Sequence, residues 1–141
     1  MVYYDRMKEI TEAIQASDYA LRCLNNASKS LDSARNWGIY DMFGGGTLST
    51  LIKHSKMSDS KYYMEQARFA LMSLKKELMD VNVLTDLKLE TGGFLEFADF
   101  FCDGFLVDWI VQGRINDARW KIRNTIYEVE NIRRQLQREI V

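Results

Sequence analysis

The stretch that most constrains the fold of this chain is FLEFADFFCDGFLVDWIV, at residues 94–111. Thirteen of its eighteen residues are apolar, and on a helical wheel they cover nearly the whole circumference. A helix that is apolar on all sides is buried inside a protein or a membrane. Four carboxylates interrupt this one, at Glu96, Asp99, Asp103 and Asp108. The stretch therefore predicts a buried helix whose acidic groups are matched to cations or face solvent.

A membrane span is the first alternative for such a stretch. Eighteen helical residues reach ~27 Å, which is nearly the thickness of a bilayer core. An acidic side chain at the bilayer centre costs roughly 3 kcal/mol even on lenient insertion scales, and this stretch carries several. Gly92, Gly93 and Gly113 flank it as turns, without basic anchors at its start. We therefore expect no membrane span.

The composition predicts a single all-α domain over residues 1–141. The chain has 47% hydrophobic and 28% charged residues, which is ordinary for a globular protein in water, and it contains no proline. Long helices exclude proline because it lacks the backbone donor and clashes with the preceding turn. The net charge of −1 offers no field that would attract nucleic acid. We therefore expect no nucleic acid partner.

Apolar periodicity predicts four long helices and one short helix. The first runs from Tyr3 to Trp37, with apolar residues at alternating three- and four-residue steps. Beside them a column of alanines recurs every seven residues, at Ala13, Ala20, Ala27 and Ala34. Small side chains at a fixed heptad position let a neighbouring helix approach closely. This helix therefore predicts coiled-coil-like packing.

The second part of the chain is predicted to form the short helix and the next long one. Thr47 or Ser49 begins a short helix that ends at Lys56. Ser58 and Asp59 then resemble a fresh N-cap, which predicts a separate helix after them.

The C-terminal third is predicted to form the last two helices. Residues 91–93 turn into the apolar helix, and Asn116 or Asp117 caps the final helix. The final helix has one apolar stripe, formed by Ile115, Ala118, Ile122, Thr125, Val129, Ile132 and Leu136. Short connections between these helices predict an up-and-down antiparallel bundle.

The cysteines and the first residues predict a cytoplasmic protein. Cys23 and Cys102 lie in predicted helices, without the spacing of a metal site or a redox motif. We expect them to be buried free thiols, as is typical of a reducing cytosol. The opening residues, MVYYDRMKEI, lack the apolar run of a signal peptide.

Two stretches resemble a family of uncharacterised bacterial helical proteins. One is WGIYDMFGGG followed by KHSK, within residues 37–56, and the other is FADFFCDGFLVDW at residues 97–109. Glu77, Leu78, Asp80 and Val81 are similar to a Glu-Leu-Ala-Asp-Val element of that family, with Met79 in place of the alanine. The resemblance covers about the central half of the chain. It implies a bacterial, intracellular, all-helical protein, and it lends no catalytic or binding residue.

The acidic residues of the apolar stretch form a candidate ligand- or metal-binding site. On a helix Glu96, Asp99 and Asp103 fall within an arc of roughly 60°. Adjacent carboxylates concentrate negative charge, which suits a hard cation or acid–base chemistry. The alternative is structural, because carboxylates on a helix commonly face solvent or pair with basic groups. The candidate basic partners on neighbouring helices are Lys53, His54, Arg119 and Arg123.

His54 limits the kinds of site that the chain can build, because it is the only histidine. A ferritin-like di-iron bundle needs two Glu-x-x-His motifs, and the sequence has none. In a ligand site, Asp41 and the aspartates of the apolar helix are the candidate partners of His54, with Lys53 beside it. The glycines at 44–46 precede a helix without the spacing of a Walker loop. We therefore predict no cofactor and leave the identity of any metal open.

Taken together, these features favour a non-enzymatic structural or protein-interaction bundle. It is expected to form a homo-oligomer or to bind a helical protein partner. The surfaces expected to do so are the alanine column of the first helix and the aromatic residues Tyr3, Tyr4, Tyr62 and Tyr63. The alternative hypothesis is a ligand- or metal-binding bundle centred on Asp99 and Asp103 and, if it reaches them, His54. An enzyme using the same groups has no motif in its favour.

Overall fold

Four helices make up the described part of the computed structural model. Its backbone is described at residues 2–36, 47–85, 87–103 and 114–140, and its side chains at 5–33, 61–85, 87–101, 103 and 114–140. The helices are α1 (Val2–Asn36), α2 (Thr47–Leu84), α3 (Gly92–Cys102) and α5 (Ile115–Arg138). These residues include no strand, so the predicted all-α class is confirmed.

Helix α1 agrees with its prediction to within a residue at each end. Its buried face combines the branched residues with the alanine column, because Ala13, Ala20 and Ala27 are all fully buried beside Leu24. The one buried hydroxyl of this face belongs to Ser17, whose Oγ donates to the carbonyl oxygen of Ile14 at 2.7 Å. These three alanines therefore lie inside the bundle, where small side chains allow close helix packing. The side chain of Ala34, the fourth of the column, lies outside the described residues.

Helix α2 corrects the prediction of two separate helices. The short helix expected to end at Lys56 and the helix expected to begin after Ser58 and Asp59 form one helix of 38 residues. Residues that prefer the N-cap are tolerated within a helix, whereas glycine and proline interrupt it. No glycine or proline occurs between Gly46 and Gly92, so nothing in the sequence forces a break there.

Helix α3 begins earlier than predicted and buries only one face. Gly92 and Gly93 belong to the helix and not to a turn before it. A side chain at position 93 would place its Cβ 2.7 Å from the carboxylate of Glu128, so glycine permits the close approach to α5. The buried face is formed by Phe94, Ala98 and Phe101. The rest of the predicted helix, at residues 104–111, lies outside the described residues.

Helix α5 confirms the predicted stripe but not the predicted cap. All seven stripe residues are buried, from Ile115 to Leu136. The N-cap position is Arg114, and Asp117 accepts a bond from its Nε at 3.0 Å. The predicted caps fail because the helix begins one residue before Asn116, so neither side chain precedes its first turn. Within the described residues, no helix is both long and apolar enough to cross a membrane.

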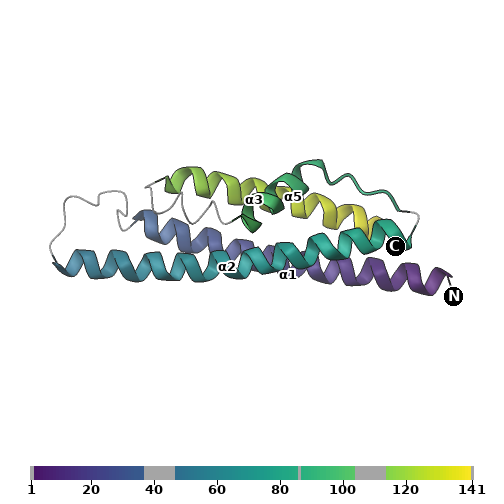
Figure 1. The fold of residues 1–141 in the computed structure, drawn as a ribbon, viewed down its shortest axis with the longest axis horizontal. Coiled ribbons are helices and arrows are strands. Elements are labelled where there is room, and N and C mark those ends of the chain that lie inside the picture. The colour runs from purple at the N-terminus through teal and green to yellow at the C-terminus, as the bar shows by residue number, and fades with distance from the viewer. Residues whose placement is uncertain (1, 37–46, 86, 104–113, 141) are drawn as a thin grey trace.

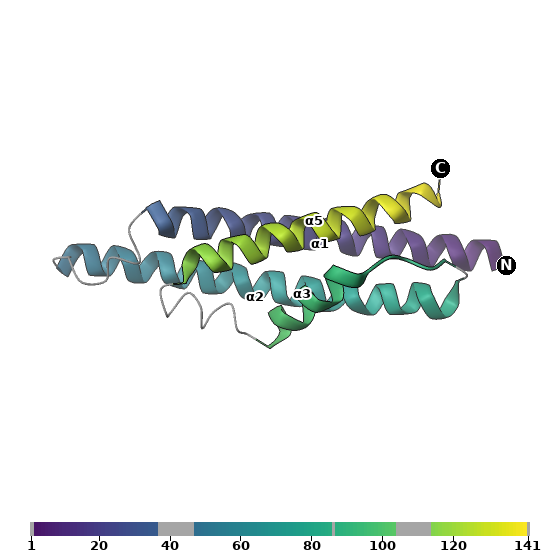
Figure 2. The same cartoon turned by 90° about the horizontal axis from the view of Figure 1, so that it is seen from above.

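The four helices pack as a ring in which each contacts two neighbours. α1 contacts α2 and α5, and α3 contacts α2 and α5. Figures 1 and 2 show α1, α2 and α5 lying lengthwise beside one another, with the short α3 at the fourth corner. Both chain termini lie at the same end of the bundle (Figure 1). Because eleven residues reach only ~16 Å, α3 covers a limited part of its corner.

The segment that leads into α3 lies against α5. Its side chains Leu87 and Leu89 pack against the core. The backbone N–H of Glu90 donates to Oε1 of Gln135 at 2.9 Å, and Nε2 of Gln135 donates back to the carbonyl oxygen of Glu90 at 3.1 Å. One side-chain amide thus satisfies both backbone groups of Glu90, as a neighbouring strand would.

Candidate functional site

The predicted acidic residues of α3 lie on its solvent side. Glu96, Asp99 and Asp103 are all exposed. Asp99 pairs with Lys75 of α2, with Nζ 2.8 Å from Oδ1. Asp103 follows the last turn of α3, where its backbone N–H donates to the carbonyl oxygen of Asp99 at 3.1 Å. Among the described groups, the three carboxylates therefore border solvent instead of the apolar core.

The other predicted site residues lie outside this description or have other partners. Asp41 lies outside the described residues, as do the side chains of Lys53 and His54, which belong to α2. Arg119 and Arg123, two of the candidate partners of the α3 carboxylates, both approach Asp32 of α1 instead. Arg119 donates from Nε to Oδ1, and Nη2 of Arg123 lies 3.9 Å from the same oxygen.

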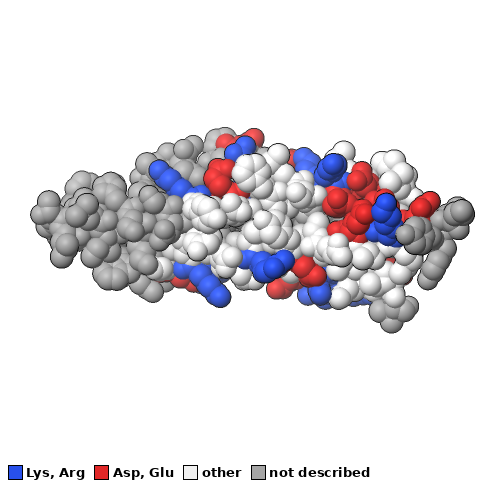
Figure 3. Space-filling view, turned by 90° about the horizontal axis from the view of Figure 1, so that it is seen from below, with Lys and Arg blue, Asp and Glu red and all other residues white. Residues whose placement is uncertain are grey.

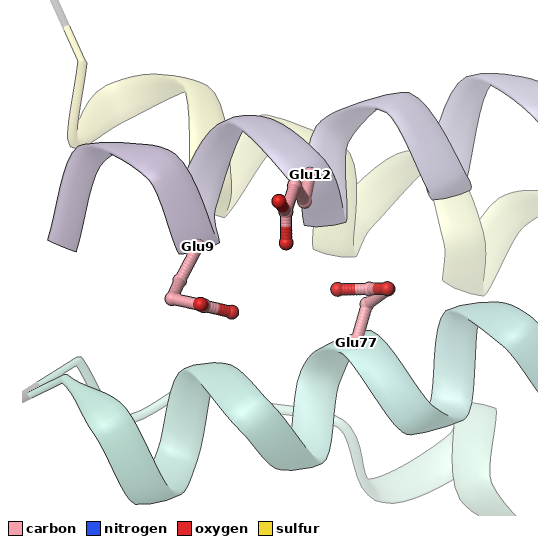
Figure 4. Close-up of side chains that lie close together, drawn as sticks. All are labelled: Glu9, Glu12 and Glu77. Atoms are coloured by element: carbon pink, nitrogen blue, oxygen red, sulfur yellow. The ribbon is translucent and has the colours of Figure 1, made fainter. Parts of the chain in front are cut away.

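A different group of carboxylates converges between α1 and α2. Glu9 and Glu12 project from α1 toward Glu77 of α2 (Figure 4), and one oxygen of each lies within 4.8 Å of the others. All three side chains are half-buried. The three-residue spacing of Glu9 and Glu12 places them on one side of α1. Only the pairing of α1 with α2 adds Glu77, which is why the sequence did not reveal the cluster.

The surroundings of Glu77 favour its protonated form. Burial raises the pKa of its carboxyl above the ordinary value of 4.5, and the nearby charges of Glu12, Asp80 and Glu9 raise this pKa further. Its Oε2 atom is buried and has no hydrogen-bond partner among the described residues. Carboxylate oxygens suit a hard cation, but acidic clusters of this kind are common without one. The cluster therefore concentrates negative charge, and burial together with this charge favours the protonated form of Glu77.

The side chain of Lys121 on α5 lies against two aromatic rings of α3. Nζ of Lys121 lies 4.6 Å from the ring centroid of Phe97 and 4.6 Å from that of Phe100. Cations are attracted to the faces of aromatic rings at such distances. The phenylalanines of α3 thus contact a cation of α5, Lys121, that was not among the predicted basic partners.

The predicted thiol burial is confirmed for Cys23, which is free and buried. A hydrogen bond with Cys23 is the main cause that raises the pKa of the neighbouring Tyr19, whose ring also lies 5.8 Å from the guanidinium carbon of Arg22. The side chain of Cys102 lies outside the described residues. The Cys23 thiol is packed in the core, and no ligating partner accompanies it in the described part of the chain.

The outer face of α2 carries large apolar side chains that no other described element covers. We call the set Tyr62, Phe69, Met72, Met79 and Val83 the outer α2 stripe. Their exposed fractions are 61%, 57%, 44%, 57% and 80% respectively. At 100° per residue they lie opposite the buried residues Leu71, Leu74 and Leu78 of the same helix. Helix α2 is therefore apolar on two opposite faces.

The outer α2 stripe contains a shallow groove that charged residues of both signs help to line. The groove is lined by Met72, Lys75, Lys76, Met79 and Asp80. Figure 3 shows that uncharged side chains occupy the middle of the face that α1 and α2 form, while acidic side chains gather toward the end that holds the N-terminus. Exposed apolar residues that lie side by side in this way form a candidate binding surface.

Comparison with known proteins returns no match to any protein family, curated protein or solved structure. The resemblance of residues 37–56 and 97–109 to a bacterial family therefore stays a prediction. The candidate function must be argued from the surface and the charges of this chain.

Proposed function

We propose that this chain is a non-enzymatic protein-interaction bundle that binds an amphipathic helix of another protein chain on the outer α2 stripe. The observation that carries this proposal is the spacing of the exposed residues on α2. From Phe69 to Val83 the large apolar residues follow heptad steps, with Lys76 completing the series. A seven-residue apolar repeat on one face is the pattern by which helices pack lengthwise against each other.

The composition of the surface supports the same proposal. Tyrosine, phenylalanine and methionine are enriched at protein interfaces, and flexible methionines adapt to apolar partners of different shapes. The alanine column of α1 was another surface predicted to bind a partner, and its burial favours the outer α2 stripe instead. Ala13, Ala20 and Ala27 are fully buried, so they are already used within the bundle.

The proposed architecture is an up-and-down antiparallel bundle that presents α2 along one edge. Three ion pairs between α1 and α5 support this arrangement. As the position rises along α1, from Arg6 to Asp18 to Asp32, the partner falls along α5, from Glu139 to Arg133 to Arg119. Such an arrangement leaves a long straight helix face available to a partner.

A labelled peptide tests the proposed function. The probe is an amphipathic 24-residue peptide with leucine at heptad positions a and d and glutamine at the flanking positions, measured by fluorescence anisotropy. We expect micromolar binding that weakens more than tenfold in the double variant Phe69→Ser and Met79→Ser, because burial of each side chain is worth roughly 1.5–3 kcal/mol.

The matched control is Tyr127→Ser on α5, where an equally exposed aromatic residue lies away from α2. This variant is expected to bind the peptide as the unmodified protein does. Equal binding by the α2 double variant, or absence of binding by the unmodified protein, contradicts the proposed function. Circular dichroism confirms that each variant remains helical.

A further inference from the structure

The heptad register of the outer α2 stripe fixes which charged residues border a docked helix. Position a is occupied by Tyr62, Phe69, Lys76 and Val83, and position d by Glu65, Met72 and Met79. On one flank, position g holds Lys61, Arg68 and Lys75 at seven-residue intervals, followed by the neutral Asn82. On the other flank, position e is nearly neutral, with Gln66, Ser73 and Asp80. The stripe is therefore asymmetric in charge.

A parallel pairing of two α2 stripes places like charges face to face. In a parallel pair each a residue meets the same residue of the second copy, and so does each d residue. Lys76 would then meet Lys76 of the second copy, and Glu65 would meet Glu65. Both contacts lie within the apolar seam, where an unpaired charge is costly.

An antiparallel pairing of two α2 stripes also brings like charges together. In two antiparallel registers Phe69 packs against a methionine of the second copy. That methionine is Met79 in the first register and Met72 in the second. In an antiparallel pair the g positions of the two helices face each other. Lys75 would therefore lie opposite Lys75 in the first register and opposite Arg68 in the second. Like charges on facing flanks destabilise such a pair.

The charges of the stripe complement an acidic helix. The basic residues beside or between the stripe residues are Lys61, Arg68, Lys75 and Lys76, whereas the acidic ones are Glu65 and Asp80. Lys61 and Lys76 are exposed, and Arg68 and Lys75 make surface ion pairs with Glu65 and Asp99. Surface pairs of this kind are weak enough to exchange for a partner's carboxylates.

We propose that the outer α2 stripe docks an amphipathic helix of a different protein, whose flank against Lys61, Arg68 and Lys75 is acidic. This inference rests on the proposed function and adds the chemistry of the partner. The basic flank disfavours a second copy of this chain, whose matching flank carries the same charge.

Three peptides that differ only at their flanking positions test the inference. They carry leucine at a and d, with glutamate, glutamine or lysine at e and g, and anisotropy reports their binding. At 50 mM salt we expect the glutamate peptide to bind about tenfold tighter than the glutamine peptide, and the lysine peptide to bind most weakly. At 500 mM salt the differences shrink, because exposed charges are screened.

A charge-reversal variant tests whether the order in which the three peptides bind is set by the charges of α2. The double variant Lys61→Glu and Lys76→Glu changes two exposed residues, so the fold is expected to persist. It is expected to bind the lysine peptide more tightly than the glutamate peptide. The matched control, Lys29→Glu with Lys88→Glu, makes the same change in net charge at exposed residues away from the stripe and is expected to keep the original order.

The outcomes distinguish the two proposals. Equal binding of all three peptides, or an unchanged order in the Lys61 and Lys76 variant, overturns the inference while the proposed function stands. Absence of binding by all three peptides overturns both. A dimer at micromolar concentration that dissociates in the Phe69→Ser and Met79→Ser variant would identify a second copy as the occupant and would also overturn the inference.

Discussion

Lys75 of α2 and Asp99 of α3 form an ion pair in which Nζ lies 2.8 Å from Oδ1. Asp99 belongs to the acidic group that the sequence analysis placed in a candidate site, and Lys75 belongs to the basic flank of the outer α2 stripe. The side chain of Asp99 is 61% exposed and that of Lys75 is 37% exposed. The pair therefore joins the two candidate surfaces, and Asp99 competes with any acidic partner for Lys75.

Replacing Asp99 is expected to affect binding more than stability. Asp99→Asn removes one negative charge beside the stripe, so the glutamate peptide should bind roughly threefold tighter at low salt. The free energy of unfolding should fall by less than about 1 kcal/mol, because exposed ion pairs contribute little. Urea unfolding and peptide anisotropy measure the two effects. A large loss of stability would instead show that Asp99 is a structural anchor of α3.

Glu77 is expected to make stability depend on pH. Because its pKa is raised in the folded state, the folded protein binds this proton more tightly than the unfolded chain does. The contribution of Glu77 to stability therefore falls as pH rises from 4.5 through the raised pKa, and it recovers on acidification. Glu77→Gln removes a charge that is disfavoured first by burial and then by repulsion, so it should stabilise the protein at pH 7.5, by no more than about 1 kcal/mol in a partly solvated site.

Urea unfolding at pH 7.5 and at pH 4.5 measures this effect. The stability gain of Glu77→Gln should be present at pH 7.5 and shrink toward pH 4.5. The matched control is Glu130→Gln, which makes the same substitution at an exposed position of α5. If both variants behave alike at both pH values, the effect belongs to net charge and not to the cluster of Glu9, Glu12 and Glu77.

The sequence predicted the buried faces of α1 and α5 well because these follow helical periodicity, whereas α3 buries only one face of a stretch that is apolar on nearly all sides. All seven predicted stripe residues of α5 are buried, and α1 was placed to within a residue. Helix boundaries were less predictable where the signal was only a residue preference. Ser58 and Asp59 favour an N-cap but do not force one, so α2 continues through them. Gly92 and Gly93 favour a turn but likewise do not force one, so α3 begins at Gly92.

The charged contacts could not be predicted because they depend on how the helices pair. Asp99 pairs with Lys75, which was not among its four expected partners. Arg119 and Arg123 approach Asp32 of α1, more than eighty residues earlier in the chain. The cluster around Glu77 arises only from the register of α1 with α2. Periodicity assigns a residue to a face of its own helix, but it does not give the register between two helices.

Enlarging the alanine column is expected to destabilise the bundle. Ala20 is fully buried between close helices, so Ala20→Leu forces extra volume into the core at a cost of roughly 1–3 kcal/mol. Asn25→Leu makes an exposed change on the same helix and should alter stability by less than about 0.5 kcal/mol. Urea unfolding compares the two variants. Equal stability would mean that the alanine column borders open space, as a surface for self-association would.

The contact between Gln135 and Glu90 is expected to hold the segment before α3 in place. Gln135→Ala removes two hydrogen bonds to the backbone of Glu90, at 2.9 and 3.1 Å. The expected cost is roughly 1–2 kcal/mol, and Gln135→Asn should not restore it, because the shorter side chain does not span the same distance. The exchange rate of the Glu90 amide hydrogen should rise in both variants, since that group loses its acceptor.

The control for this contact is Gln137→Ala on the same helix, where the side-chain oxygen accepts from Arg133 at 3.2 Å. This variant should leave the Glu90 amide protected from exchange. Protection of Glu90 that persists in Gln135→Ala would show that packing of Leu87 and Leu89, and not the amide contact, holds the segment against α5. In that case Leu89→Ala should expose the Glu90 amide, because it removes one of the two apolar anchors.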